Sequence, residues 1–147
     1  MLAIDTNILY YALLEESDLH PAARQFLESK KGSDDVVISE LVLVELYRLL
    51  RNPVLSARPL SSRAAVDVIN SFRLHPKWRV AGFPADGRLL HDKLWQKAAD
   101  PGFAYRRIYD ARLALSLAAF GVDSVATANV RDFEGFGFKR VWNPLTK

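Results

Sequence analysis

The chain contains short apolar runs without any charge, and each is followed by a longer segment with helical periodicity. Leu2–Ile4 and Val36–Ile38 are the clearest of these runs. A strand that is apolar on both faces is typical of a parallel sheet covered by helices. The alternation of such strands with helices therefore predicts an α/β fold, a three-layer sandwich with a central, mainly parallel sheet flanked by helices.

The other elements follow the same rhythm. Three further strands are expected at Arg79–Ala81, Ser124–Ala126 and Arg140–Trp142. Helices are expected at residues 8–14, 21–31, 40–50, 62–74, 87–98 and 106–120. Capping chemistry points to Thr6 or Asn7 as the residue before the first helix, and to Ser39 and Asp86 before two later ones.

Composition limits the kind of protein more than it identifies it. The 147 residues suit one domain spanning residues 1–147, and they include no cysteine, which excludes disulfides and zinc sites built on thiolates. A net charge of +3 is compatible with a polyanionic partner without requiring one. The sequence has no signal-peptide pattern and no apolar run long enough for a membrane span, so we expect a soluble, cytoplasmic protein without a membrane partner.

Two acidic residues stand out in the first third of the chain. Asp5 directly follows the first strand, at the carboxyl end where parallel sheets bind ligands, although an Asp there can also cap the next helix. Glu45 interrupts the apolar segment Leu41–Leu50. This segment predicts a helix buried on nearly every face, so Glu45 needs either a structural ion pair with Arg48 or a metal ion.

Two more acids lie in the last third. Asp110 falls early in an apolar helix, where it can also interact with the positive helix N-terminus. Asp132 lies in a polar turn after a predicted strand, where an ordinary turn residue is equally acceptable. Four converging carboxylates without cysteine or a histidine pair suit Mg²⁺ or Mn²⁺, and a site of this kind is typical of phosphodiester hydrolysis.

The ordered set of motifs resembles PIN-domain ribonucleases, in particular the VapC toxins of bacterial toxin–antitoxin modules. The resemblance covers essentially the whole chain. It rests on Asp5-Thr6-Asn7, Val44-Glu45-Leu46, Asp110-Ala111, the stretch from Thr127 to Phe133, and the closing Asn143-Pro144.

The resemblance implies a catalytic and metal-binding set of Asp5, Glu45, Asp110 and Asp132 holding Mg²⁺ or Mn²⁺. Relatives often have a carboxylate where Asn129 stands here, while others have Asn there and Asp three residues later. Asp132 is therefore favoured as the fourth acid, with Asn129 as a neutral neighbour. Thr127 is expected to orient Asp5 or a metal-bound water, and Asn7 to fix the turn that carries Asp5. The number of metal ions stays open.

The resemblance also implies an RNA substrate, a cognate antitoxin that blocks the site, and a homodimer. Arg106, Arg107 and Arg131 are the best candidates for contacts with RNA phosphates, because they adjoin the predicted acids. Val42, Leu43 and the apolar residues of the first helices are candidates for a dimer face, but burial within the monomer is the favoured interpretation. Two other functions stay open at this point: an RNA-processing nuclease without an antitoxin, and a catalytically silent RNA-binding or interaction module.

Overall fold

The computed structural model describes residues 1–146, and Lys147 lies outside the described residues. The strands are β1 (Leu2–Ile4), β2 (Val36–Ser39), β3 (Arg79–Ala81), β4 (Ser124–Ala126) and β5 (Arg140–Trp142). The α-helices are α1 (Thr6–Leu13), α2 (His20–Lys30), α3 (Glu40–Arg51), α4 (Ser62–Arg73), α5 (Gly87–Ala98) and α6 (Ile108–Ala119). Two short 3₁₀ segments complete the set, η1 (Tyr105–Arg107) and η2 (Val130–Phe133).

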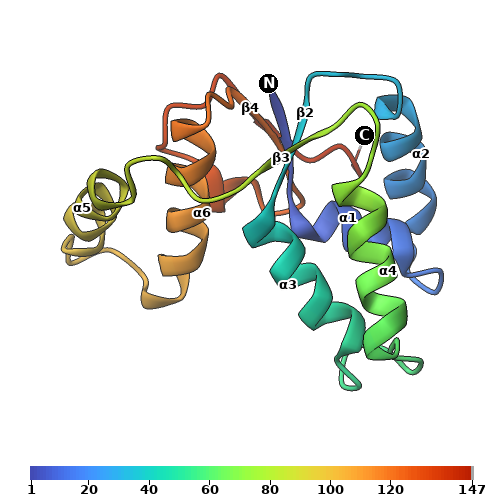
Figure 1. Cartoon of the computed structure of the whole chain (residues 1–147). Coiled ribbons are helices and arrows are strands. Elements are labelled where there is room, and N and C mark those ends of the chain that lie inside the picture. Colours follow the sequence, from blue (N-terminus) through green and yellow to red (C-terminus); the bar gives the residue numbers. More distant parts are fainter. Residues whose placement is uncertain (147) are drawn as a thin grey trace.

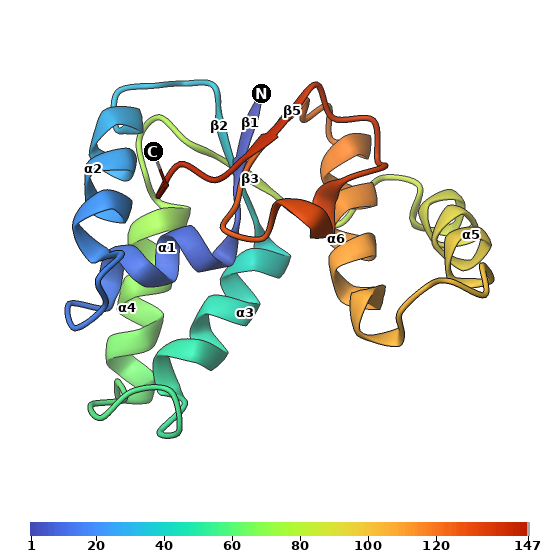
Figure 2. The same ribbon diagram turned by 180° about the vertical axis from the view of Figure 1, so that it is seen from behind.

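The five strands form one sheet in the order β3-β2-β1-β4-β5, and every neighbouring pair is parallel. Helices α1 to α4 lie on one side of the sheet, while α5 and α6 lie on the other (Figures 1 and 2). The predicted three-layer α/β fold is therefore confirmed, with a sheet that is parallel throughout. No helix within residues 1–146 is long and apolar enough to cross a membrane.

The strand order reverses its direction between β1 and β4. From β1 the chain moves outward to β2 and β3, then returns to β4 on the opposite side of β1. Ile4 at the end of β1 pairs with Ala126 at the end of β4, so the next residues of both strands leave the sheet side by side. In open parallel sheets such a reversal leaves a crevice at the carboxyl ends of the strands, where ligands bind.

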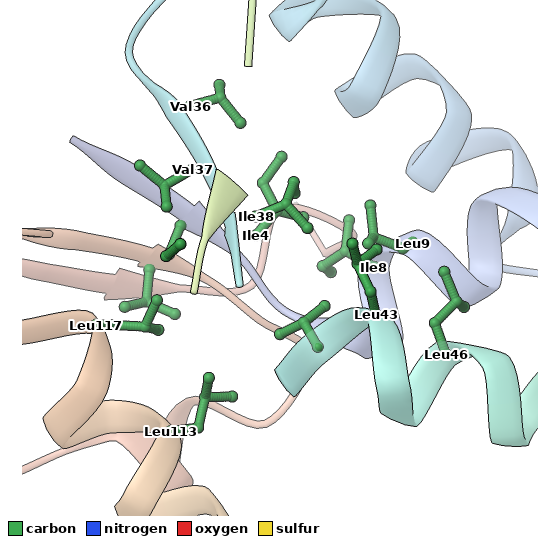
Figure 3. Close-up of a cluster of buried hydrophobic side chains, with 14 of the residues drawn as sticks. Ile4, Ile8, Leu9, Val36, Val37, Ile38, Leu43, Leu46, Leu113 and Leu117 are labelled. Carbon is green, nitrogen blue, oxygen red and sulfur yellow. The ribbon is translucent and has the colours of Figure 1, made fainter. Parts of the chain in front are cut away.

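The core lies between the sheet and the inner faces of the helices (Figure 3). On one side Ile4 and Ile38 pack against Ile8, Leu43 and Leu46, and these five side chains are at most 1% exposed. Each fully buried side chain of this size contributes roughly 1.5–3 kcal/mol to folding. The core thus holds β1, β2, α1 and α3 rigidly beneath the carboxyl end of the sheet.

The burial of one face of α3 confirms the favoured interpretation of Val42 and Leu43 as core residues of the monomer. Val42 and Leu43 are each 1% exposed and belong to the core of this chain, so they are not available as a dimer face. They point inward because the helix is amphipathic, with the side chains of Val42, Leu43, Leu46 and Leu50 on its buried stripe.

The helix starts confirm two sequence predictions and correct two others. Ser39 and Asp86 cap α3 and α5 as predicted, each through a side-chain oxygen that accepts a backbone N–H. The prediction of Thr6 or Asn7 as the first cap was wrong, because Asp5 itself caps α1. The helix expected from Arg106 instead begins with a 3₁₀ turn, and α6 starts at Ile108 with no side-chain cap. Such turns are common at uncapped helix N-termini.

Candidate active site at the carboxyl end of the sheet

Asp5 is fixed in place by three hydrogen bonds directly after β1. Its Oδ1 accepts the backbone N–H of Thr6 at 2.8 Å, while its Oδ2 accepts the Thr127 hydroxyl at 2.7 Å and the Asn7 amide at 3.2 Å. Capping and participation in a site, posed as alternatives from the sequence, are therefore compatible, because the two carboxylate oxygens face different partners. The carboxylate has one defined orientation at the point where the strand order reverses.

Thr127 and Asn7 join the ends of β1 and β4 across this reversal. Thr127 is fully buried directly after β4, and its hydroxyl oxygen also accepts the backbone N–H of Asn129 at 3.0 Å. The side-chain oxygen of Asn7 accepts the backbone N–H of Ala128 at 3.0 Å. Both residues lie where the sequence predicted supporting residues, and together they hold the loop after β4 against Asp5.

Glu45 reaches the same end of the sheet from α3. The prediction that its side chain is buried was wrong. Glu45 lies on the exposed face of the helix, and its Oε2 accepts the hydroxyl of the buried Thr6 at 3.0 Å. The helix is amphipathic rather than apolar all round, because Val44, Glu45 and Arg48 share its exposed side. Among the described residues Glu45 forms no ion pair with Arg48, so this structural alternative was also wrong.

Asp110 and Asp132 approach from the last third of the chain. Asp110 lies in the first turn of α6, and Asp132 lies in η2, where its backbone N–H donates to the Asn129 carbonyl at 3.1 Å. Both side chains are partly buried. The negative charges of Asp132 and Glu45 both act on Asp110, and those of Glu45 and Asp110 act on Asp5. The fold thus brings Asp5 and Glu45 within electrostatic range of Asp110, and Asp132 within range of Asp110.

The protein does not neutralise this concentration of negative charge. Burial raises the pKa of Asp5 to about 6, and the repulsion by Glu45 and Asp110 adds to the effect against the hydrogen bonds from Thr127 and Thr6. Burial and the charge of Asp132 likewise raise the pKa of Asp110 to about 6, partly offset by Arg107. Among residues 1–146 none of the four acids forms an ion pair.

The donor set fits a hard divalent cation. All the available ligand atoms are carboxylate, hydroxyl or amide oxygens, which Mg²⁺ and Mn²⁺ prefer. In the described part of the chain no three acidic or histidine side chains are already arranged to hold a metal ion. Carboxylates without a cation repel one another, and Glu45 is hydrogen-bonded to the neutral hydroxyl of Thr6.

The predicted phosphate-binding arginines differ in their surroundings. Arg107 is half-buried, lies close enough to Asp110 to lower its pKa, and donates from a guanidinium nitrogen to the Arg131 carbonyl at 3.4 Å. Arg106 and Arg131 are exposed, and neither forms an ion pair with a described residue. Asn129 is exposed, and its side chain makes no hydrogen bond to a described residue. All four lie on the loops that border the acids.

The sequence offered no reason to assign Thr6 to the site, although the residue makes hydrogen bonds to two of the acids. Thr6 is 2% exposed, donates its backbone N–H to Asp5, and donates its hydroxyl to Glu45, so the residue rather than its side chain alone joins the two acids. The available signal was its position between Asp5 and Asn7, two residues already assigned to the site. A threonine beside a carboxylate has too many ordinary explanations to be selected from sequence alone.

Sequence comparison agrees with the geometry. A family model described as the PIN domain matches residues 2–137. The chain is 46% identical over 146 residues to Ribonuclease VapC24 from two strains of Mycobacterium tuberculosis. The match covers 99% of this chain and 98% of the relative.

Solved structures share the fold. A Mycobacterium tuberculosis VapC20, described as a toxin that cleaves the sarcin–ricin loop, superposes with a TM-score of 0.67 at 24% identity, covering 94% of this chain and 96% of that chain. FitAB bound to a DNA fragment gives a TM-score of 0.69 at 18% identity, covering 100% of this chain and 97% of that one. VapBC2 from Rickettsia felis bound to promoter DNA gives 0.67 at 18% identity, with 97% of each chain covered.

Proposed function

This chain belongs to the PIN-domain family, as a VapC-type ribonuclease toxin of a toxin–antitoxin module, and we propose that its acidic cluster hydrolyses RNA with Mg²⁺ or Mn²⁺. The observation that carries the proposal is the set of four acids around the end of β1, whose charges the protein leaves unpaired. An uncompensated cluster of this kind costs folding free energy, so its retention calls for a cation from outside the chain.

In this proposal Asp5, Glu45, Asp110 and Asp132 hold the cation. When bound, the cation lowers the pKa of an attacking water and offsets charge on the phosphate. Thr127 and Asn7 orient Asp5 through their hydrogen bonds, and Thr6 positions Glu45. No serine, cysteine or histidine is needed as a nucleophile.

The arginines complete the proposed substrate site. Arg107 is held beside Asp110 and matches phosphate oxygens with its planar guanidinium, while Arg106 and Arg131 supply exposed positive charge on the same loops. These three cations attract the RNA backbone to an otherwise negative site.

An antitoxin is the second proposed partner. The VapBC2 and FitAB complexes are toxin–antitoxin structures bound to DNA, and their toxin fold matches this chain. By this likeness we propose a cognate antitoxin that covers the acidic cluster and blocks access of RNA, and a homodimer of the toxin. Growth arrest on expression of this chain, relieved by a small protein encoded beside it, supports the toxin. Harmless expression without such a neighbour favours an RNA-processing nuclease.

The direct test is RNA cleavage with and without EDTA, followed by the Asp5→Asn and Asp110→Asn variants. We expect EDTA to abolish cleavage and each variant to lose about 10³-fold or more in rate, equivalent to ~4 kcal/mol of transition-state stabilisation. Asp67→Asn is the matched control, because Asp67 is an exposed acid on α4, paired with Arg63 at 3.7 Å. Full cleavage in EDTA, or by both site variants, would refute the metal mechanism. If the wild type and the site variants all bind RNA and none of them cleaves it, the result would favour the catalytically silent RNA-binding module.

A further inference from the structure

A second concave surface adjoins the acidic cluster on the α5 side of the molecule. It is a cleft of about 630 Å³ between the end of α5, the turn that follows it, and the loop after η2. We name it the α5–η2 cleft and define it by five of its lining residues, Lys93, Lys97, Phe103, Arg107 and Phe136. A volume of this size falls within the range of about 300–1,000 Å³ that is typical of ligand sites.

The cleft carries positive charge that the protein does not pair. Lys93 and Lys97 are exposed and lie four residues apart, so both project from one face of α5. Neither lysine forms an ion pair within residues 1–146, and Lys97 donates only to the Gly135 carbonyl at 3.3 Å. Two acids, Asp100 and Glu134, also line the cleft, and Asp100 accepts the backbone N–H of Gly102 at 2.8 Å. Against these two carboxylates, the lysines and Arg107 leave an excess of one positive charge.

Aromatic rings lie among these cations. Phe103 and Phe136 are partly buried at the cleft wall, and the Lys97 ammonium lies 4.5 Å from the centre of the Phe136 ring. Grooves that bind single-stranded nucleic acid combine these two elements, with cations for the backbone and aromatic faces for unpaired bases.

Arg107 connects the cleft to the acidic cluster. It lines the cleft, lies three residues before Asp110, and donates to the carbonyl of Arg131, the residue beside Asp132. An RNA strand whose phosphate lies at the acids therefore passes Arg107 on its way to Lys97 and Lys93. Figure 1 shows α5 beside α6, the helix that carries Asp110.

We propose that the α5–η2 cleft binds the single-stranded RNA next to the scissile bond, with Lys93 and Lys97 on its phosphates and the two phenylalanines against its bases. This inference rests on the proposed ribonuclease function and extends it with a substrate-binding site. It assigns to α5 a part in holding unpaired RNA, the form in which bases are free to stack.

The test measures binding rather than cleavage, so that it is separate from the proposed catalysis. A fluorescent single-stranded RNA of about 12 nucleotides is titrated in EDTA against the wild type and the Lys93→Gln/Lys97→Gln variant. The matched control is Lys30→Gln/Lys31→Gln, which removes the same charge from the end of α2, far from the cleft. We expect the cleft variant to bind roughly tenfold more weakly, while the control stays within twofold of the wild type.

The salt dependence of RNA binding gives a second measure of the lost phosphate contacts. Because each neutralised phosphate on a single strand contributes about 0.7 to the slope of log Kd against log salt, loss of two contacts lowers that slope by about 1.4. Equal losses in both double variants, or an unchanged slope and affinity in the cleft variant, would overturn the proposal. Intact RNA binding with weakened inhibition by the antitoxin would also overturn it, since the cleft would then bind an acidic protein segment instead. If the Lys93→Gln/Lys97→Gln variant binds RNA like the wild type, the proposal is overturned whether or not cleavage is also lost.

Discussion

The two ends of the parallel sheet both carry acids, but the protein treats them in opposite ways. At the amino end, Asp123 lies 3.2 Å from the Met1 ammonium and 3.5 Å from Lys139, and the hydrogen bond from this ammonium lowers the pKa of Asp123. At the carboxyl end, burial and mutual repulsion raise the pKa of Asp5 and Asp110 to about 6. The first end is neutralised by the protein itself, whereas at the second Arg107 acts on Asp110 without forming an ion pair, and the acids keep an excess of negative charge.

The strand β4 carries this contrast within a few residues. At its start the Ser124 hydroxyl donates to Asp123 at 3.1 Å, and just past its end the Thr127 hydroxyl donates to Asp5 at 2.7 Å. The local chemistry is the same, a hydroxyl on a carboxylate. Only the surroundings differ, since one carboxylate faces solvent and cations while the other is enclosed among acids. Acidic residues alone therefore do not mark a site, but unpaired enclosed ones do.

The largest expected difference between the two ends is in activity. Thr127→Val removes the hydroxyl that orients Asp5 and keeps the side-chain shape, so we expect RNA cleavage to fall about 10–100-fold. Because Thr127 lowers the pKa of Asp5, the variant also needs a higher pH for half-maximal rate. Ser124→Ala deletes the equivalent bond at the other end and leaves rate and pH profile unchanged. Equal effects of both substitutions on the pH–rate profile would remove the distinction.

We expect the free energy of unfolding of the metal-free protein, measured in EDTA, to depend on pH through Asp5. An acid whose pKa is higher in the folded state than its unfolded value of 3.8 is protonated more in the folded chain, so it favours folding at low pH. This contribution is lost as the pH rises from about 4 through 6. Asp5→Asn should therefore reduce the decrease in unfolding free energy as the pH rises. It should stabilise the metal-free protein by ~1–2 kcal/mol at pH 7.5. Urea unfolding at a series of pH values measures this, and a destabilised variant would contradict it.

The smallest effect is expected at the amino end. Asp123→Asn removes the negative partner of exposed cations, so we expect a slight fall in melting temperature near neutral pH. This change in stability has the opposite sign to that of Asp5→Asn, because the pKa of Asp123 is lowered in the folded state. Its carboxylate therefore stabilises the fold at pH values above the pKa of the unfolded chain, and this contribution disappears as the pH falls. Thermal unfolding at pH 7 and pH 3 checks this, and a stabilised Asp123→Asn protein at pH 7 would contradict it.

The sequence predicted the sheet well because strand signals are local. The runs at β3, β4 and β5 have the predicted bounds, since each is a short apolar segment between turn residues. The family prediction and the ribonuclease class are likewise confirmed by the match to the PIN-domain model and to Ribonuclease VapC24. The residue roles within the site stay predictions, because neither the fold nor the comparisons test them.

The errors concern side-chain surroundings, which depend on contacts distant in sequence. Glu45 was expected to be buried because its neighbours are apolar, yet Val44 beside it is 68% exposed. The partner of Glu45 is Thr6, which lies 39 positions earlier and is brought close by the packing of α1 against α3. The α5–η2 cleft was missed for the same reason, because its lysines and aromatic residues come from separate segments.

Calorimetric titration of Mn²⁺ tests whether the acids at the carboxyl end of the sheet are left unpaired for a divalent cation. We expect binding to the wild type and to Asp123→Asn with similar affinity, and loss of binding in Asp5→Asn and Asp110→Asn. Circular dichroism spectra of the variants would verify that each is folded. Absence of Mn²⁺ and Mg²⁺ binding by the folded wild type, or equal binding by all four proteins, would contradict the account.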